Sequence, residues 1–257
     1  MVTNQWEYPK SSYAGGKRLD VVLLINGIPM VIGELKTATK ANVTWADGAR
    51  DIADYQKSIP EMFVPNILSF ASEGKELYYA AIGAPLTKWG PWFAQEQRNH
   101  GTLKDVQENL ANLIEPLRLI DIYRFFTVFT TDKKSSKKIK VVCRYQQYFG
   151  GMAIVDCVMA RTKTGIGPKK GLIWHFQGSG KSWLMVFASQ MLMKQQALNA
   201  PTVVIVDDRR DLRAQITGDF TRAEIPNIDF AYTKEELKNF FKLRSEERVS
   251  RNAETDI

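Results

Sequence analysis

The sequence predicts an α/β protein, in which a mixed β-sheet flanked by helices is followed by a second segment built around a glycine-rich loop. Two observations carry this prediction. Residues 20–36 contain two apolar runs joined by Asn-Gly, and residues 171–194 contain an apolar run, a loop ending in Gly-Lys-Ser and a helix-like stretch. A chain of 257 residues is long enough to bury a sizeable core around such strands, in one or two domains.

The segment from Asp20 to Lys36 is predicted to form a β-hairpin. Asn-Gly between β-rich runs is the strongest short-range hairpin signal, because both residues tolerate positive φ. Asp20 enters the first run, while Glu34 and Lys36 close the second. Charges on otherwise buried strands are costly unless something binds them, and two carboxylates repel unless a cation lies between them. The hairpin therefore predicts a site for a divalent metal ion.

The register of this hairpin decides whether Asp20 joins the other two charges. Glu34 and Lys36 are two residues apart, so they point to the same face of the sheet. A plain two-residue turn would place Asp20 opposite Gly33, across the sheet from Glu34. One extra loop residue or one bulge would place Asp20 opposite Glu34 instead. The metal-site hypothesis therefore requires such an irregularity.

The spacing Asp-x13-Glu-x-Lys across a hairpin resembles the metal-dependent nuclease core written PD-(D/E)xK. The stretch from Lys17 to Lys36, with Asn-Gly-Ile-Pro between its halves, is similar to the restriction (R, HsdR) subunit of type I restriction-modification enzymes. The resemblance implies that Asp20, Glu34 and Lys36 are catalytic. Asp20 and Glu34 are then the expected ligands of Mg²⁺, with the backbone carbonyl of Leu35 as a candidate third ligand.

Only nineteen residues precede Asp20, which leaves little room for the helix that usually comes before the hairpin in such nuclease cores. We therefore expect the domain to be short or truncated at its N-terminus.

Residues 46–58 are predicted to form a helix that ends before Pro60, because the residue before a proline is pushed out of the helical region. In the resembling family, this helix carries a Gln-xxx-Tyr motif beside the active site. Tyr55 matches the tyrosine and is an auxiliary candidate for the nuclease site, with a purely buried role as the alternative. Asp51 stands where the glutamine would be, and an aspartate on a helix favours a surface position.

The next hundred residues are predicted to continue the α/β pattern. Strands are expected at 66–72 and 77–83, and helices at 102–117 and 119–129. Residues 130–140 carry a run of lysines and are predicted to be an exposed linker, with contact to DNA phosphates as the alternative.

The stretch from residue 171 to the Gly-Lys-Ser triplet has the order that a phosphate-binding loop needs. Glycines let backbone N–H groups face the phosphates, Lys181 reaches the β- and γ-phosphates, and Ser182 ligates Mg²⁺. His175 stands at the first glycine of the generic pattern, but Trp-His-x-x-Gly-Ser-Gly-Lys-Ser resembles motif I of superfamily 2 helicases. ATP is therefore the expected ligand. Its predicted binding residues here are Gly178, Ser179, Gly180, Lys181 and Ser182.

Two flanking stretches extend this resemblance. Residues 144–149 resemble the segment that reads adenine before motif I, in which either Gln146 or Gln147 would face the base. Residues 209–215 resemble helicase motif Ia, so residues 201–208 are predicted to be the strand before it. The alternative is that residues 201–208 form a Walker B strand. No Asp-Glu-Ala-His or similar sequence occurs, so the motor is expected to be incomplete. ATP turnover requires those missing groups, and we expect nucleotide binding to be weak.

These patterns divide the chain near the lysine run. Residues 1–135 are predicted to form the PD-(D/E)xK nuclease-like domain. Residues 136–257 are predicted to form an incomplete first RecA-like motor lobe with a charged tail.

The composition is that of an ordinary soluble globular protein, with 44% apolar and 25% charged residues. A formal charge of +7 and a pI of about 9.3 permit a polyanionic partner. Two cysteines and two histidines are too few for a disulfide framework and lack zinc-site spacing. No membrane span or signal peptide is indicated, so we expect a cytoplasmic protein with no membrane partner.

The function expected from the sequence is thus that of a fragment of a type I R subunit, a Mg²⁺-dependent endonuclease. The resemblance implies that the intact enzyme couples cleavage of double-stranded DNA to ATP-driven translocation. It also implies methyltransferase (M) and specificity (S) subunits as partners. The alternatives are a nucleotide-binding or subunit-interaction module without nuclease activity, and a DNA-binding platform that uses basic surface alone.

Overall fold

A computed structural model of the protein describes residues 1–9, 16–40, 42–94, 98–132, 135–167, 170–207, 210–223, 225 and 228–243. The chain divides into two compact units, Met1–Glu224 and Ile225–Ile257, and each is described by itself. Most of the predicted charged tail, residues 244–257, lies outside the described residues, as do Lys133 and Lys134 of the lysine run. The predicted boundary near residue 135 stays a prediction.

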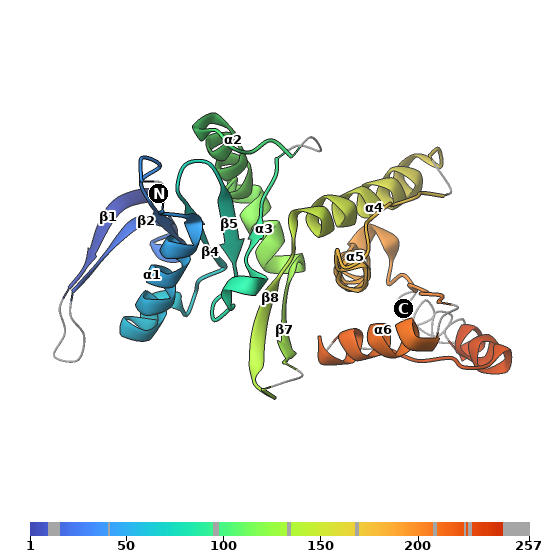
Figure 1. The fold of residues 1–257 in the computed structure, drawn as a ribbon. Coiled ribbons are helices and arrows are strands. Elements are labelled where there is room, and N and C mark those ends of the chain that lie inside the picture. The colour runs from blue at the N-terminus through green and yellow to red at the C-terminus, as the bar shows by residue number, and fades with distance from the viewer. Residues whose placement is uncertain are drawn as a thin grey trace. The chain divides into compact units, whose positions relative to one another are not determined.

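The first unit begins with a mixed six-stranded sheet, as the sequence predicted (Figure 1). β3 and β4 are parallel, and all other neighbouring strands are antiparallel. The strands follow one another in space in chain order: β1 (Val2–Tyr8), β2 (Lys17–Ile25), β3 (Ile28–Leu35), β4 (Leu68–Ser72), β5 (Leu77–Ala80) and β6 (Gly90–Pro91).

The edge strand β1 was missed from the sequence. It pairs with β2 in the segment that seemed too short for the usual helix. Its inner side chains Trp6 and Tyr8 pack against the main core. Their two-residue spacing, typical of a strand, was the signal that was overlooked.

A bulge sets the register of the β2–β3 hairpin. The turn residues Asn26 and Gly27 have φ of 50° and 80°, as an Asn-Gly turn between antiparallel strands requires. Leu24 pairs with Pro29, whereas Leu23 pairs with Val31, so one residue of β3 has no partner between them. The irregularity that the metal-site hypothesis demanded is therefore a bulge in the strand, not a longer loop.

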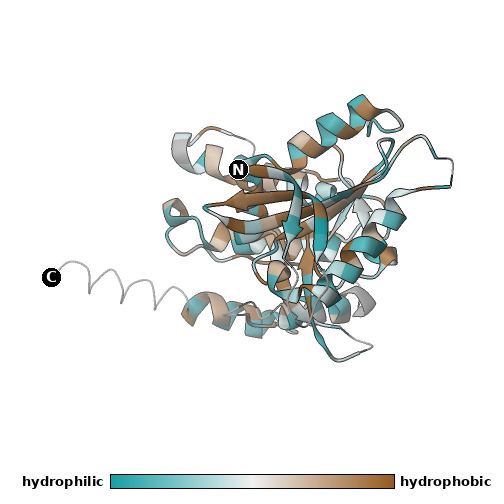
Figure 2. Cartoon of the chain, turned by 90° about the vertical axis from the view of Figure 1, so that its left-hand side faces the viewer, coloured by the Kyte–Doolittle hydropathy of each residue, from teal (hydrophilic) through white to brown (hydrophobic). Residues whose placement is uncertain are grey.

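Helix α1 (Trp45–Ser58) covers β3 and β4. Thr44 and Asp47 form a capping box at its start, and Pro60 follows its end, as predicted. Gly48 allows a close approach, since a Cβ there would lie 3.3 Å from Cγ of Glu34. Figure 2 shows the hydrophobic strands at the centre of this arrangement. The buried core includes Leu19, Val22, Ile32, Ile52, Phe63 and Ala71.

The predicted helices after the sheet are α2 (Leu103–Leu113) and α3 (Pro116–Phe125). Residues 130–140 were expected to be an exposed linker, but both ends of this stretch lie in paired strands, β7 (Thr127–Thr131) and β8 (Lys138–Val142). Lys140 is partly buried and donates a hydrogen bond to the Asn66 carbonyl. A lysine-rich stretch is not always an exposed loop, because the aliphatic part of a lysine side chain can pack against the protein while its ammonium stays polar.

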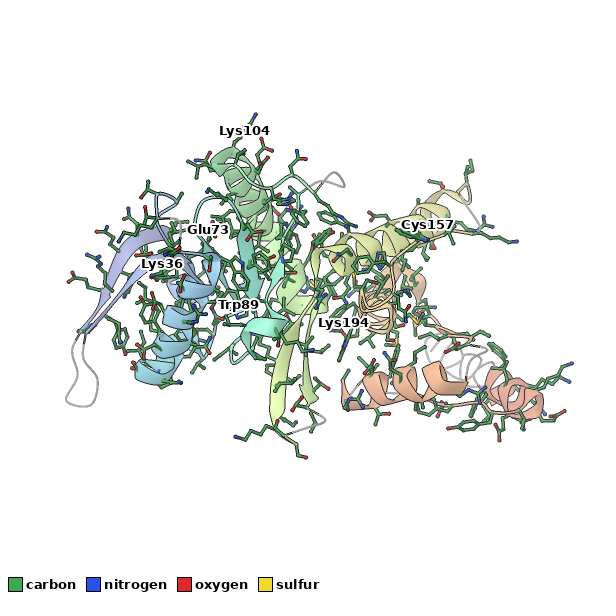
Figure 3. All side chains as sticks on the ribbon, viewed as in Figure 1. Lys36, Glu73, Trp89, Lys104, Cys157 and Lys194 are labelled. Carbon is green, nitrogen blue, oxygen red and sulfur yellow. The ribbon has the colours of Figure 1, made fainter. Side chains whose placement is uncertain are left out.

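The aromatic residues before α2 belong to the protein interior. Trp92 is fully buried and donates a hydrogen bond from its indole N–H to Asn112 at 2.8 Å. Trp89, labelled in Figure 3, is also buried. Neither side chain has a free face for a nucleic acid base.

The other α-helices in the described part of this unit are α4 (Tyr145–Thr164), α5 (Lys181–Met193) and α6 (Arg210–Arg222). α4 packs against α5. Residues 201–208 were predicted to be a strand, and the apolar run at 171–175 is strand-like in sequence, but no described residue of either pairs with a strand in the described chain. Leu172, Trp174 and Val206 are 93%, 80% and 85% exposed. A parallel strand needs neighbours to satisfy its backbone, and no described strand is placed to provide them.

The second unit contains a helical stretch at residues 234–243. The Glu236 carboxylate accepts the backbone N–H groups of Tyr232 and Thr233, and the Thr233 hydroxyl accepts that of Glu236. This reciprocal capping fixes where the helix begins.

Candidate nuclease and nucleotide sites

The bulged register brings Asp20 and Glu34 to one face of the sheet. Val21 pairs with Gly33, so the preceding residue Asp20 lies level with Glu34 across the hairpin. The Asp20 carboxylate accepts the backbone N–H of Leu35 at 2.9 Å, which holds it against β3. The two predicted carboxylates therefore lie on the same face of the hairpin, level with each other.

Glu34 is a buried carboxylate, with 4% of its surface exposed. Its Oε1 accepts a hydrogen bond from Lys36 at 2.8 Å, and its Oε2 accepts one from the Tyr55 hydroxyl at 3.2 Å. Burial raises the pKa of Glu34, the Lys36 hydrogen bond opposes this, and the negative charge of Asp20 adds to it. Such a destabilised carboxylate gains by binding a cation.

The Lys36 ammonium lies between two carboxylates. It forms ion pairs with Glu34 and with Asp51 on α1, and Figure 3 shows it beside that helix. Burial alone would lower the pKa of Lys36, but the hydrogen bonds to Asp51 and Glu34 outweigh it and hold the pKa above its usual value. Lys36 is therefore a cation at neutral pH.

Asp51 is the residue of this site that sequence reasoning missed. The sequence favoured a surface position, and the side chain is indeed about half exposed, but its carboxylate binds Lys36. Helical spacing from Tyr55 was the available signal, because residues four apart share one face of a helix.

Tyr55 completes the cluster from the same helix. Its hydroxyl lies 3.2 Å from both the Glu34 carboxylate and the Arg18 carbonyl, and one hydrogen is shared between these acceptors. Burial, followed by the charge of Glu34, raises the pKa of Tyr55. The side chain is therefore a neutral hydrogen-bond donor rather than a base.

The donor set suits a hard divalent cation. Within the described ranges, no group of three or more His, Cys, Asp and Glu side chains is arranged to hold a metal ion. Mg²⁺, however, is usually held in proteins by one or two carboxylates together with water and substrate phosphates. Asp20 and Glu34 meet that requirement.

The glycine-rich loop leads directly into α5. Gly178 and Gly180 have φ of 81° and 83°, a conformation that glycine adopts without strain. Lys181 is the first residue of the helix, and its ammonium donates to the carbonyls of His175 and Phe176, both at 3.0 Å. The five predicted nucleotide-binding residues are thus contiguous at a helix N-terminus, where anions are favoured.

The two serines of this loop differ in their contacts. Ser182 is buried and its hydroxyl accepts a hydrogen bond from Gln215 of α6 at 3.4 Å. Ser179 is also buried, but among the described residues its hydroxyl has no hydrogen-bond partner.

Gln146 and Gln147 lie in the first turn of α4, and their side chains have different contacts. Gln147 donates to the Gly180 carbonyl at 3.0 Å and accepts the Arg144 backbone N–H at 2.7 Å. The side-chain oxygen of Gln146 is buried and finds no partner in the part of the chain that is described. Gln147 thus supports the loop, while Gln146 keeps an open acceptor.

A cavity of about 850 Å³ lies beside the loop. Its walls come from α4, the segment before the loop and α5, and they include Cys157, Arg161, His175, Lys181 and Leu184. Burial, with the nearby Lys181 charge, lowers the pKa of His175.

None of the described helices is long and apolar enough to cross a membrane.

Two family models match separate parts of the chain. The type I restriction enzyme R protein N terminus matches residues 1–88, which contain Asp20, Glu34, Lys36 and Tyr55. The SWI2/SNF2 ATPase matches residues 146–251, which contain the glycine-rich loop.

The curated relatives are subunits of type I restriction enzymes, as is the first of these two families. The type I restriction enzyme HindI endonuclease subunit of Haemophilus influenzae is 32% identical over 82% of this chain and 20% of its own length. The type I restriction enzyme MjaVIIP endonuclease subunit of Methanocaldococcus jannaschii is 32% identical over 80% of this chain and 19% of its own. The chain therefore spans about a fifth of these relatives. It belongs with the R subunits of type I restriction enzymes, with the R protein N terminus at residues 1–88 and a SWI2/SNF2 ATPase segment at 146–251.

Proposed function

We propose that this chain carries the DNA-cleaving site of a type I restriction R subunit, a PD-(D/E)xK site in which Asp20 and Glu34 bind Mg²⁺. The single observation that supports it most is the bulge in β3, which places both carboxylates on one face. Lys36 and Tyr55 meet Glu34 on that same face.

The protein groups divide the work of phosphodiester hydrolysis. A bound divalent cation supplies Lewis acidity to the phosphate and to the attacking water. Asp20 and Glu34 would hold that cation. The Lys36 ammonium offsets the negative charge that develops on the phosphate, which is most effective from a fixed position. Tyr55 holds Glu34 by its hydroxyl.

We further propose that the glycine-rich loop binds the phosphates of ATP. The chain offers the backbone N–H groups of 178–182, the Lys181 ammonium and the Ser182 hydroxyl, which would ligate Mg²⁺. Lys181 must leave its two carbonyl partners to reach a phosphate. The open acceptor of Gln146 suits the adenine amino group better than Gln147, which already supports the loop.

The resemblance to type I restriction enzymes supports a proposal for the larger assembly. We propose double-stranded DNA as the substrate and the M and S subunits as partners, with ATP-driven translocation and a cytoplasmic location. In this proposal residues 1–135 are the nuclease domain, and residues 136–257 are part of a RecA-like motor lobe.

Metal-dependent cleavage of supercoiled plasmid tests the nuclease. The wild-type chain is expected to nick DNA with Mg²⁺ or Mn²⁺, and Asp20→Ala and Lys36→Ala are expected to lower the rate at least about 100-fold. Asp54→Ala is the matched control, because Asp54 pairs with Lys17 at the surface. Undiminished cleavage by Asp20→Ala would refute the assignment.

A further inference from the structure

The three aspartates of α1 have separate contacts. Asp47 caps the helix and pairs with Arg50, and Asp54 pairs with Lys17 at 2.5 Å. Asp51 instead points to the sheet and binds the Lys36 ammonium. Only this aspartate contacts the cluster around Glu34 in the described contacts of α1.

One face of α1 contacts two residues at the C-terminal end of β3, Glu34 within the strand and Lys36 just after it. Asp51 and Tyr55 are four residues apart and therefore lie on the same side of the helix. Tyr55 binds Glu34 and Asp51 binds Lys36, which are themselves two residues apart along the strand direction. Gly48 lets the helix come this close, since any larger side chain would press on Glu34.

Glu34 has two roles that compete. Its Oε1 binds Lys36 in the structure, but the same carboxylate is the proposed ligand of a divalent cation. When the Glu34 oxygens bind that cation, the ion pair between Glu34 and the Lys36 ammonium becomes weaker. A lysine has a flexible four-carbon stem, so an ammonium without a second partner samples many positions.

We infer that Asp51 is a positioning residue, which keeps the Lys36 ammonium at the nuclease site when Glu34 binds a cation. The inference rests on the proposed nuclease function and adds to it a residue on α1. The carboxylate of Asp51 is half exposed, so it accepts Lys36 without the full cost of a buried charge. A loss of Asp51 leaves Lys36 bound to Glu34 alone, where it opposes metal binding.

Cleavage by the full chain gives the first test. Asp51→Asn is expected to lower kcat about 10- to 100-fold with KM for DNA unchanged, since a misplaced group costs that much. Asp51→Glu keeps the charge and is expected to restore part of the rate. Asp54→Asn removes the same charge from the same helix and is expected to stay within about 2-fold of wild type.

A double-mutant cycle separates positioning from a general loss of structure. If Asp51 acts through Lys36, then Lys36→Ala and the double variant with Asp51→Asn cleave at the same rate. Multiplied effects of the two substitutions would overturn the inference. So would an Asp51→Asn variant that matches Asp54→Asn.

Binding of Mn²⁺, followed by electron paramagnetic resonance, gives a readout independent of cleavage. Asp51→Asn is expected to weaken Mn²⁺ binding about 3- to 10-fold in the wild-type background and less than about 2-fold in Lys36→Ala. Equal weakening in both backgrounds would make Asp51 a metal ligand and overturn the inference. Unchanged Mn²⁺ binding in Asp20→Ala would instead refute the proposed metal site, and the inference with it.

Discussion

The Tyr55 hydroxyl on α1 lies 3.2 Å from Oε2 of Glu34 on β3 and donates its hydrogen to a carboxylate that is almost fully buried. Tyr55→Phe removes this donor without changing the shape of the ring. We expect the free energy of unfolding to fall by roughly 1 kcal/mol, because a buried acceptor loses a partner. Urea denaturation measures this. Tyr123→Phe, at an exposed tyrosine, is the control and is expected to be neutral.

Gly33 lies against the ring of Phe70, which limits what the centre of β3 accepts. A Cβ at position 33 would lie 2.1 Å from Cζ of Phe70. Gly33→Ala is therefore expected to destabilise the protein by about 1–3 kcal/mol. Gly90→Ala is the matched control in another strand, because its Cβ would meet no atom within 4 Å. Phe70→Leu should recover part of the loss in the Gly33→Ala background. Equal stability of the two alanine variants would contradict the packing described here.

Alanine substitutions at Gly180 and Gly178 separate two reasons for a glycine in the loop at 178–182, a positive φ and the lack of space for a Cβ. Both have positive φ, so alanine strains either by roughly 1 kcal/mol. Only at Gly180 would the added Cβ also clash, at 2.3 Å from the Gln147 amide nitrogen. Binding of a fluorescent ATP analogue is expected to fall much further in Gly180→Ala than in Gly178→Ala. Equal losses would show that Gln147 yields freely.

Lys140 gives the protein a pH dependence above neutrality. Burial lowers the pKa of Lys140 to about 8, below its usual value of 10.5. Between these two values the unfolded chain binds more protons than the folded one, so stability rises with pH. Relative to Lys140→Met, wild type is expected to gain roughly 1–3 kcal/mol in free energy of unfolding from pH 8 to 10.5.

Denaturation series across this pH range measure that gain. Lys137→Met removes an exposed lysine of the same run and is the control. Relative to Lys137→Met, wild type is expected to show no such gain in the free energy of unfolding. A constant difference between wild type and Lys140→Met across the range would contradict the burial of Lys140.

The hairpin shows how far sequence reasoning reaches. Asn26-Gly27 marks the turn, and the two-residue period of a strand places Glu34 and Lys36 on one face. That period also showed that Asp20 could join them only through an irregularity. It did not tell a bulge from a longer loop, because that choice depends on how the strand packs against its neighbours.

Other features depended on contacts between distant parts of the chain. Asp51 was placed on a helix by its sequence, but its partner is set by how closely α1 approaches the sheet at Gly48. The runs at 171–175 and 201–207 have the apolar character of strands, yet a strand exists only with a paired neighbour. The described ends of the 130–140 stretch belong to β7 and β8, which pair with each other, and its lysine content did not indicate these strands.

Crystals of the protein soaked in Mn²⁺ test the central claim most directly. An anomalous scattering peak is expected on the α1 side of the sheet, with carboxylate oxygens of both Asp20 and Glu34 at roughly 2.0–2.6 Å, the range of hard divalent cations. Asp20→Ala crystals should lose the peak, whereas Asp54→Ala crystals should keep it. Saturating Mn²⁺ without a peak between Asp20 and Glu34, or with one that survives Asp20→Ala, would contradict the account.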